Sequence, residues 1–80
     1  MMNEIRYYLT MMKNTLEQED EKAFKPTYIV CAIKLPSGAI ELQVNDTSIL
    51  EKINYILDAY DDNMTLKTNS VIEIKNVMVV

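Results

Sequence analysis

The segment TYIVCAIKLPSGAIELQV, residues 27–44, decides the fold because it reads as two strands joined by a tight turn. Its first half is rich in β-branched residues, which favour strands. Pro36 suits the first corner of a turn, and Gly38, the one glycine of the chain, can adopt the left-handed conformation that such a turn requires. We therefore predict a β-hairpin here.

The two predicted strands differ in their apolar patterns. The second strand alternates, which predicts that its apolar residues point inward (Ile40, Leu42 and Val44) and its polar residues outward (Glu41 and Gln43). The first strand is apolar on both faces. One face would carry Ile29, Cys31, Ile33 and Leu35, and the other Tyr28, Val30 and Ala32. A strand of this kind is typically covered on both sides.

A helix is predicted on either side of the hairpin. Before it, within residues 2–18, apolar residues recur at helical spacing: Ile5, Leu9, Met12 and Leu16. The opposite, solvated side of this helix would carry Arg6, Thr10, Lys13 and Glu17. After the hairpin, Ser48 and Glu51 have the spacing of a capping box, which predicts the start of a second helix with one apolar stripe facing the sheet.

Two further strands are predicted after the second helix, NMTLKT at residues 63–68 and VIEIKNVMVV at residues 71–80. The expected fold is a single α+β domain over residues 1–80, in the order α-β-β-α-β-β, with about four largely antiparallel strands packed with two helices. In the last strand, regular alternation predicts one face with Ile72, Ile74, Met78 and Val80. The other face would hold Val71, Val77 and Val79.

The small size of the chain favours an oligomer. A core of 80 residues supplies only about 3–5 kcal/mol unless a disulfide, a metal or a partner subunit adds to it. One cysteine and no histidine exclude an intramolecular disulfide and a structural zinc site. If both helices cover one face of the sheet, the other face is an apolar interface; if each covers one face, the protein is a monomer. We expect a homodimer, with an interface at Tyr28, Val30, Val77 and Val79.

The residues available for catalysis do not predict an enzyme. Without histidine the chain has no Ser-His or Cys-His pair, and Cys31 lies on a predicted buried strand, where a thiol is usually inert. The acidic segment at residues 58–63 lacks the central glycine and closing glutamate of an EF-hand, so we expect neither a metal nor a cofactor. Acidic residues at a helix C-terminus oppose the helix dipole, which hints at another use.

The composition of the chain limits its possible cellular location and the classes of partner that it could bind. Glu4 and Arg6 interrupt the N-terminal segment where a signal peptide needs an unbroken apolar stretch, and no segment reaches membrane-spanning length. We therefore expect a cytoplasmic protein that does not enter a membrane. A net charge of −4, from 12 acidic and 8 basic residues, argues against nucleic acid as the partner and favours a basic protein surface.

Our leading hypothesis is a non-catalytic interaction protein that binds a protein partner through an acidic and aromatic surface. The predicted surface consists of Tyr7, Met11, Glu51, Tyr55, Asp58, Asp61 and Asp62. The alternative is a protein that binds or sequesters a small, nucleotide-like molecule at an oligomer interface. Arg6, Lys13 and the strand lysines are the groups that could contact such an anion.

The second half of the chain resembles short accessory proteins encoded by phages and prophages of low-GC Gram-positive bacteria. The resemblance lies in KINYILDAYDD, residues 52–62, followed by LKTNSVIEI, residues 66–74, and an apolar C-terminus. It implies a protein that acts in the host cytoplasm and binds and inhibits a host enzyme or defence protein. It contains no catalytic motif and assigns no role to any residue.

Overall fold

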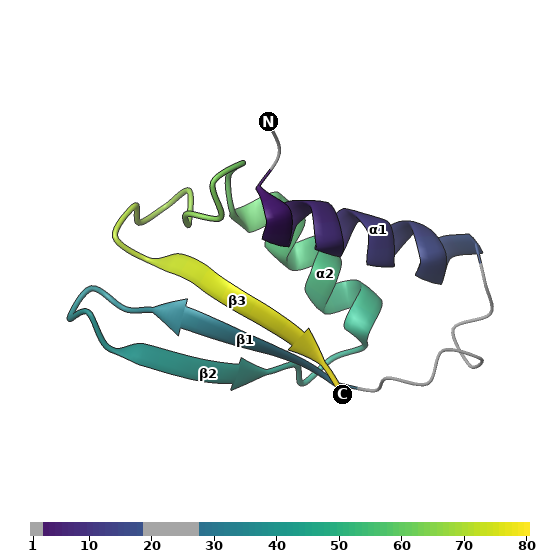
Figure 1. Cartoon of the computed structure of the whole chain (residues 1–80), viewed down its shortest axis with the longest axis horizontal. Helices are drawn as coiled ribbons and strands as arrows, with labels where there is room; N and C mark the ends of the chain where they lie inside the picture. Colours follow the sequence, from purple (N-terminus) through teal and green to yellow (C-terminus); the bar gives the residue numbers. More distant parts are fainter. Residues whose placement is uncertain (1–2, 19–27) are drawn as a thin grey trace.

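The computed structural model describes residues 3–18 and 28–80. The described elements, in chain order, are α1 (Glu4–Gln18), β1 (Ile29–Lys34), β2 (Ile40–Val44), α2 (Ile49–Ala59) and β3 (Glu73–Val79). The predicted α+β class with two helices is confirmed, whereas the sheet has three strands and the order is α-β-β-α-β. Both helices lie on the same side of the sheet (Figure 1).

The sheet is antiparallel throughout, with β1 between β2 and β3. The predicted hairpin is confirmed: Gly38 has φ = 90° and donates its N–H to the carbonyl of Leu35 at 2.9 Å. Where β2 ends, the Asn45 side chain turns back toward β1 and accepts the N–H of Ile29 at 2.7 Å. The buried Asn45 thus fixes the ends of the two strands together.

The predicted strand at residues 63–68 does not form. Only two isolated bridges, Tyr60↔Leu66 and Thr65↔Glu73, lie in this part of the chain. Met64 is buried at φ = 62°, a left-handed conformation that interrupts an extended strand. The Asp61 carboxylate holds the turn by accepting the N–H groups of residues 63 and 65 at 2.9 and 3.0 Å. A local side-chain to backbone network therefore replaces the ladder that alternation predicted.

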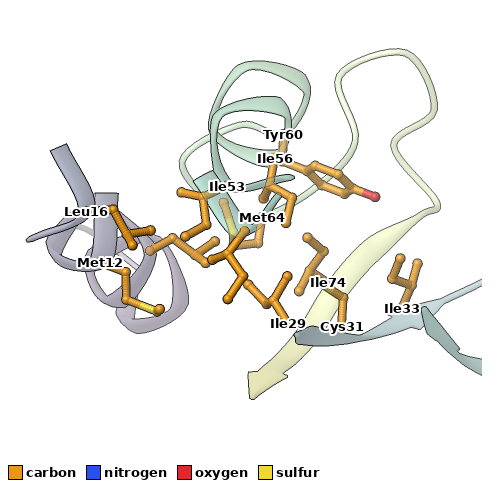
Figure 2. Close-up of a cluster of buried hydrophobic side chains, with 12 residues drawn as sticks. Met12, Leu16, Ile29, Cys31, Ile33, Ile53, Ile56, Tyr60, Met64 and Ile74 are labelled. Atoms are coloured by element: carbon orange, nitrogen blue, oxygen red, sulfur yellow. The ribbon is translucent and has the colours of Figure 1, made fainter. Parts of the chain in front are cut away.

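Both helices begin at a capping side chain. Asn3 Oδ1 accepts the N–H of Ile5 at 2.8 Å at the start of α1. Ser48 Oγ accepts the N–H of Glu51 at 3.1 Å, which confirms the predicted start of α2. The core between helices and sheet (Figure 2) consists of Leu9, Met12, Leu16, Ile29, Cys31, Ile33, Ile49, Ile53, Ile56, Tyr60, Met64 and Ile74.

A β-bulge changes which face the end of β3 presents. Ala32 pairs with Asn76, but the next residue of β1 pairs with Ile74, so Lys75 is an extra residue on β3. Beyond the bulge, Val77 and Val79 lie opposite Cys31 and Ile29 of β1 and pack against the core. The regular alternation predicted for the last strand is therefore wrong: Val77 and Val79 share the face of Ile74, and Met78 lies on the other face.

The predicted orientation of β2 is also wrong. Ile40, Leu42 and Val44 are 54, 69 and 54% exposed, and they point away from the helices. Their partners in β1 are Lys34, Ala32 and Val30, which alternate with the buried residues of that strand. Alternation identifies the residues that share a face, but it does not identify the face that the helices cover.

Candidate functional site

One face of the sheet carries no helix, and we call it the open sheet face. It consists of alternate residues of the three strands and their ends: Tyr28, Val30, Ala32, Lys34, Ile40, Leu42, Val44, Glu73, Asn76, Met78 and Val80. Tyr28 and Val80 extend the ladder by one pair, each donating its N–H to the other's carbonyl at 3.1 and 3.0 Å.

The open sheet face is strongly apolar. Six of its large side chains are between 53 and 69% exposed: Tyr28, Ile40, Leu42, Val44, Met78 and Val80. Single exposed apolar residues are common on any protein, but a contiguous group over three strands usually marks an interaction surface. This face is therefore the foremost candidate site within the described part of the chain.

The surface of the open sheet face has a shallow hollow at Ala32 and, beside it, the strongly exposed side chain of Leu42. A hollow of about 80 Å³ lies above the short side chain of Ala32. Its lining residues are Val30, Ala32, Leu42, Asn76, Val77 and Met78. Leu42, which pairs with Ala32 across the strands, is the most exposed of the large apolar residues described, at 69%.

Charge on the open sheet face is confined to one end and is balanced there. Lys34 of β1 lies in register with Glu73 of β3. The Glu73 carboxylate also accepts a hydrogen bond from the ammonium of Lys75 at the bulge, at 3.0 Å. The other residues that form this face carry no charge. The net charge of −4 on the chain therefore comes from groups outside it.

The four residues predicted as an oligomer interface do not share one face. Tyr28 and Val30 lie on the open sheet face, whereas Val77 and Val79 are half-buried against the core on the helix-covered face. The sequence analysis did not predict that the apolar residues of β2 form the largest part of the exposed apolar surface on the open sheet face. The hairpin turn contained the signal, because a turn at Pro36–Gly38 sets the register that places residues 40, 42 and 44 beside residues 34, 32 and 30.

The residues predicted as a partner surface on the helices are exposed. Tyr7 and Met11 are 58 and 50% exposed on α1, and Tyr55 is 55% exposed on α2 beside the exposed Glu51 and Asp58. They lie on the helix sides opposite the buried stripes, so they point away from the sheet. The outer side of the helices is thus a second surface, distinct from the open sheet face.

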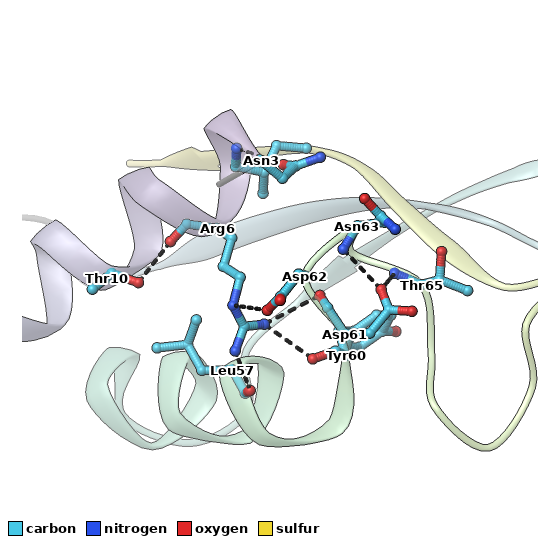
Figure 3. Close-up of polar contacts among 10 residues, drawn as sticks. Asn3, Arg6, Thr10, Leu57, Tyr60, Asp61, Asp62, Asn63 and Thr65 are labelled. Atoms are coloured by element: carbon cyan, nitrogen blue, oxygen red, sulfur yellow. Dashed lines mark hydrogen bonds and ion pairs between the residues drawn. The ribbon is translucent and has the colours of Figure 1, made fainter. Parts of the chain in front are cut away.

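The two aspartates after α2 do not belong to a free acidic patch. The Asp61 carboxylate is half-buried and bonded to backbone N–H groups, as described above. The Asp62 carboxylate lies 3.4 Å from Nε of Arg6. Arg6, which was predicted to face solvent, instead donates to the carbonyls of Leu57, Tyr60 and Asp61 at 3.0, 3.0 and 3.2 Å (Figure 3). Its cation offsets the acidic charge at this helix end.

A cavity of about 300 Å³ lies between α2 and the helix-covered side of the sheet. Its lining residues are Cys31, Ile33, Leu35, Gln43, Lys52, Tyr55, Ile56, Tyr60, Leu66, Ile72 and Ile74. Lys52 is the only charged residue among them, and its ammonium lies 5.2 Å from the centre of the Tyr55 ring.

Two ionisable groups of this cavity keep their protons at neutral pH. Burial raises the pKa of the Cys31 thiol, although the nearby Lys52 ammonium lowers it in part. Burial also raises the pKa of the Tyr60 hydroxyl, and charge on Tyr55 and Cys31 adds to that effect. Cys31 is therefore a protonated, buried thiol, the form in which cysteine is least nucleophilic.

Among residues 3–18 and 28–80, no three aspartate, glutamate, cysteine or histidine side chains lie close enough together to hold a metal ion. None of the described helices has both the length and the hydropathy needed to span a membrane. Comparison of the chain with known protein families, with curated proteins and with solved structures finds no match.

Proposed function

We propose that the protein is a non-catalytic interaction protein that binds another protein chain through its open sheet face. The observation that carries the proposal is the group of six large apolar residues, each more than half exposed, on a face that neither helix covers. Burying the exposed part of one such side chain contributes on the order of 1 kcal/mol. Six of them contribute about 6 kcal/mol, which is comparable to the lower part of the roughly 4–15 kcal/mol of freedom lost on association, so the partner supplies the remaining contacts.

The side chains that could perform chemistry support a role without catalysis. The chain has no histidine, and its one thiol is buried and protonated. The Asp61 carboxylate is engaged by backbone N–H groups, and the Arg6 guanidinium is engaged by backbone carbonyls. The polar groups with the most hydrogen bonds thus hold the fold together, and residues 3–18 and 28–80 contain no assembled set of nucleophile, base and oxyanion donor.

The outer side of the helices is the second surface in this proposal. Tyr7, Met11 and Tyr55 offer apolar contact, while Glu51 and Asp58 favour a basic partner and faster association. The resemblance of the second half to phage accessory proteins supports a host enzyme or defence protein as that partner, bound and inhibited in the host cytoplasm. Asp61 contributes little to such a surface because its carboxylate accepts backbone N–H groups, whereas Asp62 is 90% exposed and its charge is only partly offset by Arg6.

Native mass spectrometry of the protein purified from bacterial cytosol tests the role of the open sheet face. We expect the wild type to retain a bound protein chain and Leu42→Glu, at a site 69% exposed, to release it. The matched control is Val71→Glu, at an apolar site that is 55% exposed before β3 and belongs to neither surface, which should keep the bound chain. A wild-type spectrum of bare monomer, identical to that of Leu42→Glu, would refute the proposal.

The cavity beneath α2 favours a second candidate function, the binding of a small molecule. Its volume of about 300 Å³ is at the lower end of the range of ligand pockets, and its walls combine apolar side chains with the polar groups of Gln43, Tyr55 and Tyr60 and one cation, Lys52. This chemistry fits a small amphipathic anion, such as a carboxylate with a short apolar tail. It fits a nucleotide less well, since Arg6 is already bonded to the end of α2.

Titration with octanoate, followed by amide NMR, tests this second function. We expect shifts at Ile33 and Ile72, which line the cavity, and loss of these shifts in Lys52→Met. Lys75→Met, which removes an exposed lysine outside the cavity, is the control. Shifts at Leu42 and Met78 in place of the cavity residues would assign octanoate to the open sheet face and reject the cavity as the site.

A further inference from the structure

We infer that the chain covering the open sheet face is a second copy of this protein, with Leu42 of each copy seated over Ala32 of the other. This inference rests on the proposed function, because it names the occupant of the same surface.

The relief of the face is complementary to itself. Ala32 and Leu42, which are directly opposite in neighbouring strands, both line a hollow of about 80 Å³, and Leu42 is the most exposed large apolar side chain of the face, at 69%. A two-fold axis that runs along the strands between β1 and β2 places each Leu42 over the partner's Ala32, so that one rotation satisfies both contacts. In this arrangement β1 of each copy lies over β2 of the other, and β3 lies outside the overlap. Reciprocal contacts of this kind define the interface of a two-fold dimer.

The charge distribution permits two copies to meet face to face. Two chains that each carry −4 repel one another where their acidic groups approach. On the open sheet face, however, the charges are one lysine and one glutamate, Lys34 and Glu73, which lie in register at one end. The central part contains apolar side chains and the amide of Asn76. Dimerisation here buries no cluster of like charges and leaves the acidic helix surface in solvent.

The dimensions of the face predict a weak dimer. The two overlapping strands, about 4.8 Å apart and with about 3.3 Å per residue, give a contact roughly 10 Å wide and 20 Å long, about 200 Å² per copy. This footprint is well below the roughly 800 Å² per partner of a standard interface, so we expect a dissociation constant that is micromolar or weaker. Two sheets of the same twist pack with their strands about 30° apart, which would leave the helices as the outer layers of the dimer.

The experiment exchanges the projection and the hollow. Analytical ultracentrifugation gives the dimer dissociation constant of wild type, Ala32→Leu, Leu42→Ala and the double variant. We expect Ala32→Leu to fill the hollow and Leu42→Ala to leave it empty, each raising the constant by about tenfold or more. In the double variant, leucine at position 32 faces alanine at position 42 of the other copy, so each contact again has one large and one small side chain. Its dimer dissociation constant should therefore return to within about threefold of the wild-type value.

Each outcome of this experiment is decisive. If the wild type is a monomer at all concentrations, the inference is overturned. The proposed function would still stand if native mass spectrometry showed that the wild type binds a different protein chain and that Leu42→Glu releases it. A dimer whose dissociation constant is unchanged in both single variants would overturn the inference, since the dimer interface would then lie elsewhere; the proposed function would fail only if Leu42→Glu also kept every bound chain. A double variant no tighter than the single ones would overturn the Leu42–Ala32 contact. Val71→Ala, at an exposed site outside the open sheet face, should match wild type, and circular dichroism confirms that each variant is folded.

Discussion

Arg6 of α1 donates from Nη1 to the carbonyl of Tyr60 at 3.0 Å, so a side chain of one helix caps the end of the other. The same guanidinium reaches the carbonyls of Leu57 and Asp61, which also lie at the end of α2 (Figure 3). The last carbonyls of a helix have no partner within the helix, and a cation there also interacts favourably with the helix dipole. Arg6 therefore joins the two helices at the point where the core ends.

Replacing Arg6 with alanine should lower the free energy of unfolding by about 2–3 kcal/mol, because half-buried carbonyls lose a charged donor. Arg6→Lys should cost roughly half as much, since an ammonium keeps the charge but not the planar fork. The control is Lys13→Ala, which breaks only an exposed pair with Glu17 at 3.9 Å and should cost about 0.5 kcal/mol or less. Urea unfolding measures all three. Equal losses for Arg6→Ala and Lys13→Ala would contradict the capping role.

The adjacent aspartates should differ sharply in their effect on stability. Asp61→Ala removes the acceptor of two backbone N–H groups in the turn that positions the buried Met64, and should cost about 1–2 kcal/mol. Asp62→Ala removes a side chain that is 90% exposed and should change stability by about 0.5 kcal/mol or less. Asp61→Asn, which keeps the accepting oxygen, should recover most of the loss. Thermal unfolding of the three variants would reject this assignment if Asp61→Ala matched Asp62→Ala.

Local signals in the sequence predicted local structure well. Ser48 and Glu51 located the start of α2, and Gly38 located the hairpin turn, because each signal depends on residues within a few positions of one another. The predicted strand at residues 63–68 was wrong because a residue outside that segment decides its structure. The Asp61 carboxylate forms hydrogen bonds that hold a turn there, and the alternation of apolar and polar residues gives no sign of them.

The candidate site was harder to predict because it depends on tertiary arrangement. The sequence left two alternatives: both helices cover the same face of the sheet, or each helix covers one face. Only the positions of the two helices in the structure decide between them. Sequence periodicity placed Leu42 inside and Val77 outside, and both assignments were wrong. The first depends on which face the helices cover, and the second on a bulge at Lys75 that breaks the period of two.

Stability should fall as pH rises above the ordinary pKa of cysteine, about 8.5. Burial raises the pKa values of Cys31 and Tyr60 in the folded protein, so the unfolded chain loses these protons first. The stabilisation is complete below the unfolded pKa and is lost as pH rises through the folded one. Unfolding in urea at pH 7, 9 and 10 should therefore give decreasing free energies.

Two variants separate the contributions to this pH dependence. Cys31→Ala should be less stable than wild type at pH 7, because it leaves a cavity, but its stability should fall less steeply between pH 8 and 10. Tyr60→Phe should reduce the fall near pH 10. Tyr7→Phe removes the same hydroxyl from an exposed site and should keep the wild-type slope. If all three variants keep that slope, the two buried groups do not cause it.

The bulge at Lys75 makes an unusual deletion tolerable. With Lys75 removed, Ile74, Asn76 and Val77 alternate regularly between the two faces, and each apolar residue keeps its present side. The deletion loses only an exposed ion pair with Glu73, so we expect the free energy of unfolding to change by less than about 1 kcal/mol.

Deletion of Met78 is the matched comparison, since Met78 is also about half exposed in the same strand. Here the ladder is regular, so the deletion moves Val79 to the open sheet face, brings Val80 into the core position that Val79 leaves, and removes the pair of Tyr28 with Val80. We expect this variant to lose about 1–2 kcal/mol more than the Lys75 deletion, because the two backbone hydrogen bonds of that pair are lost. Equal urea midpoints for the two deletions would show that the bulge does not absorb the missing residue.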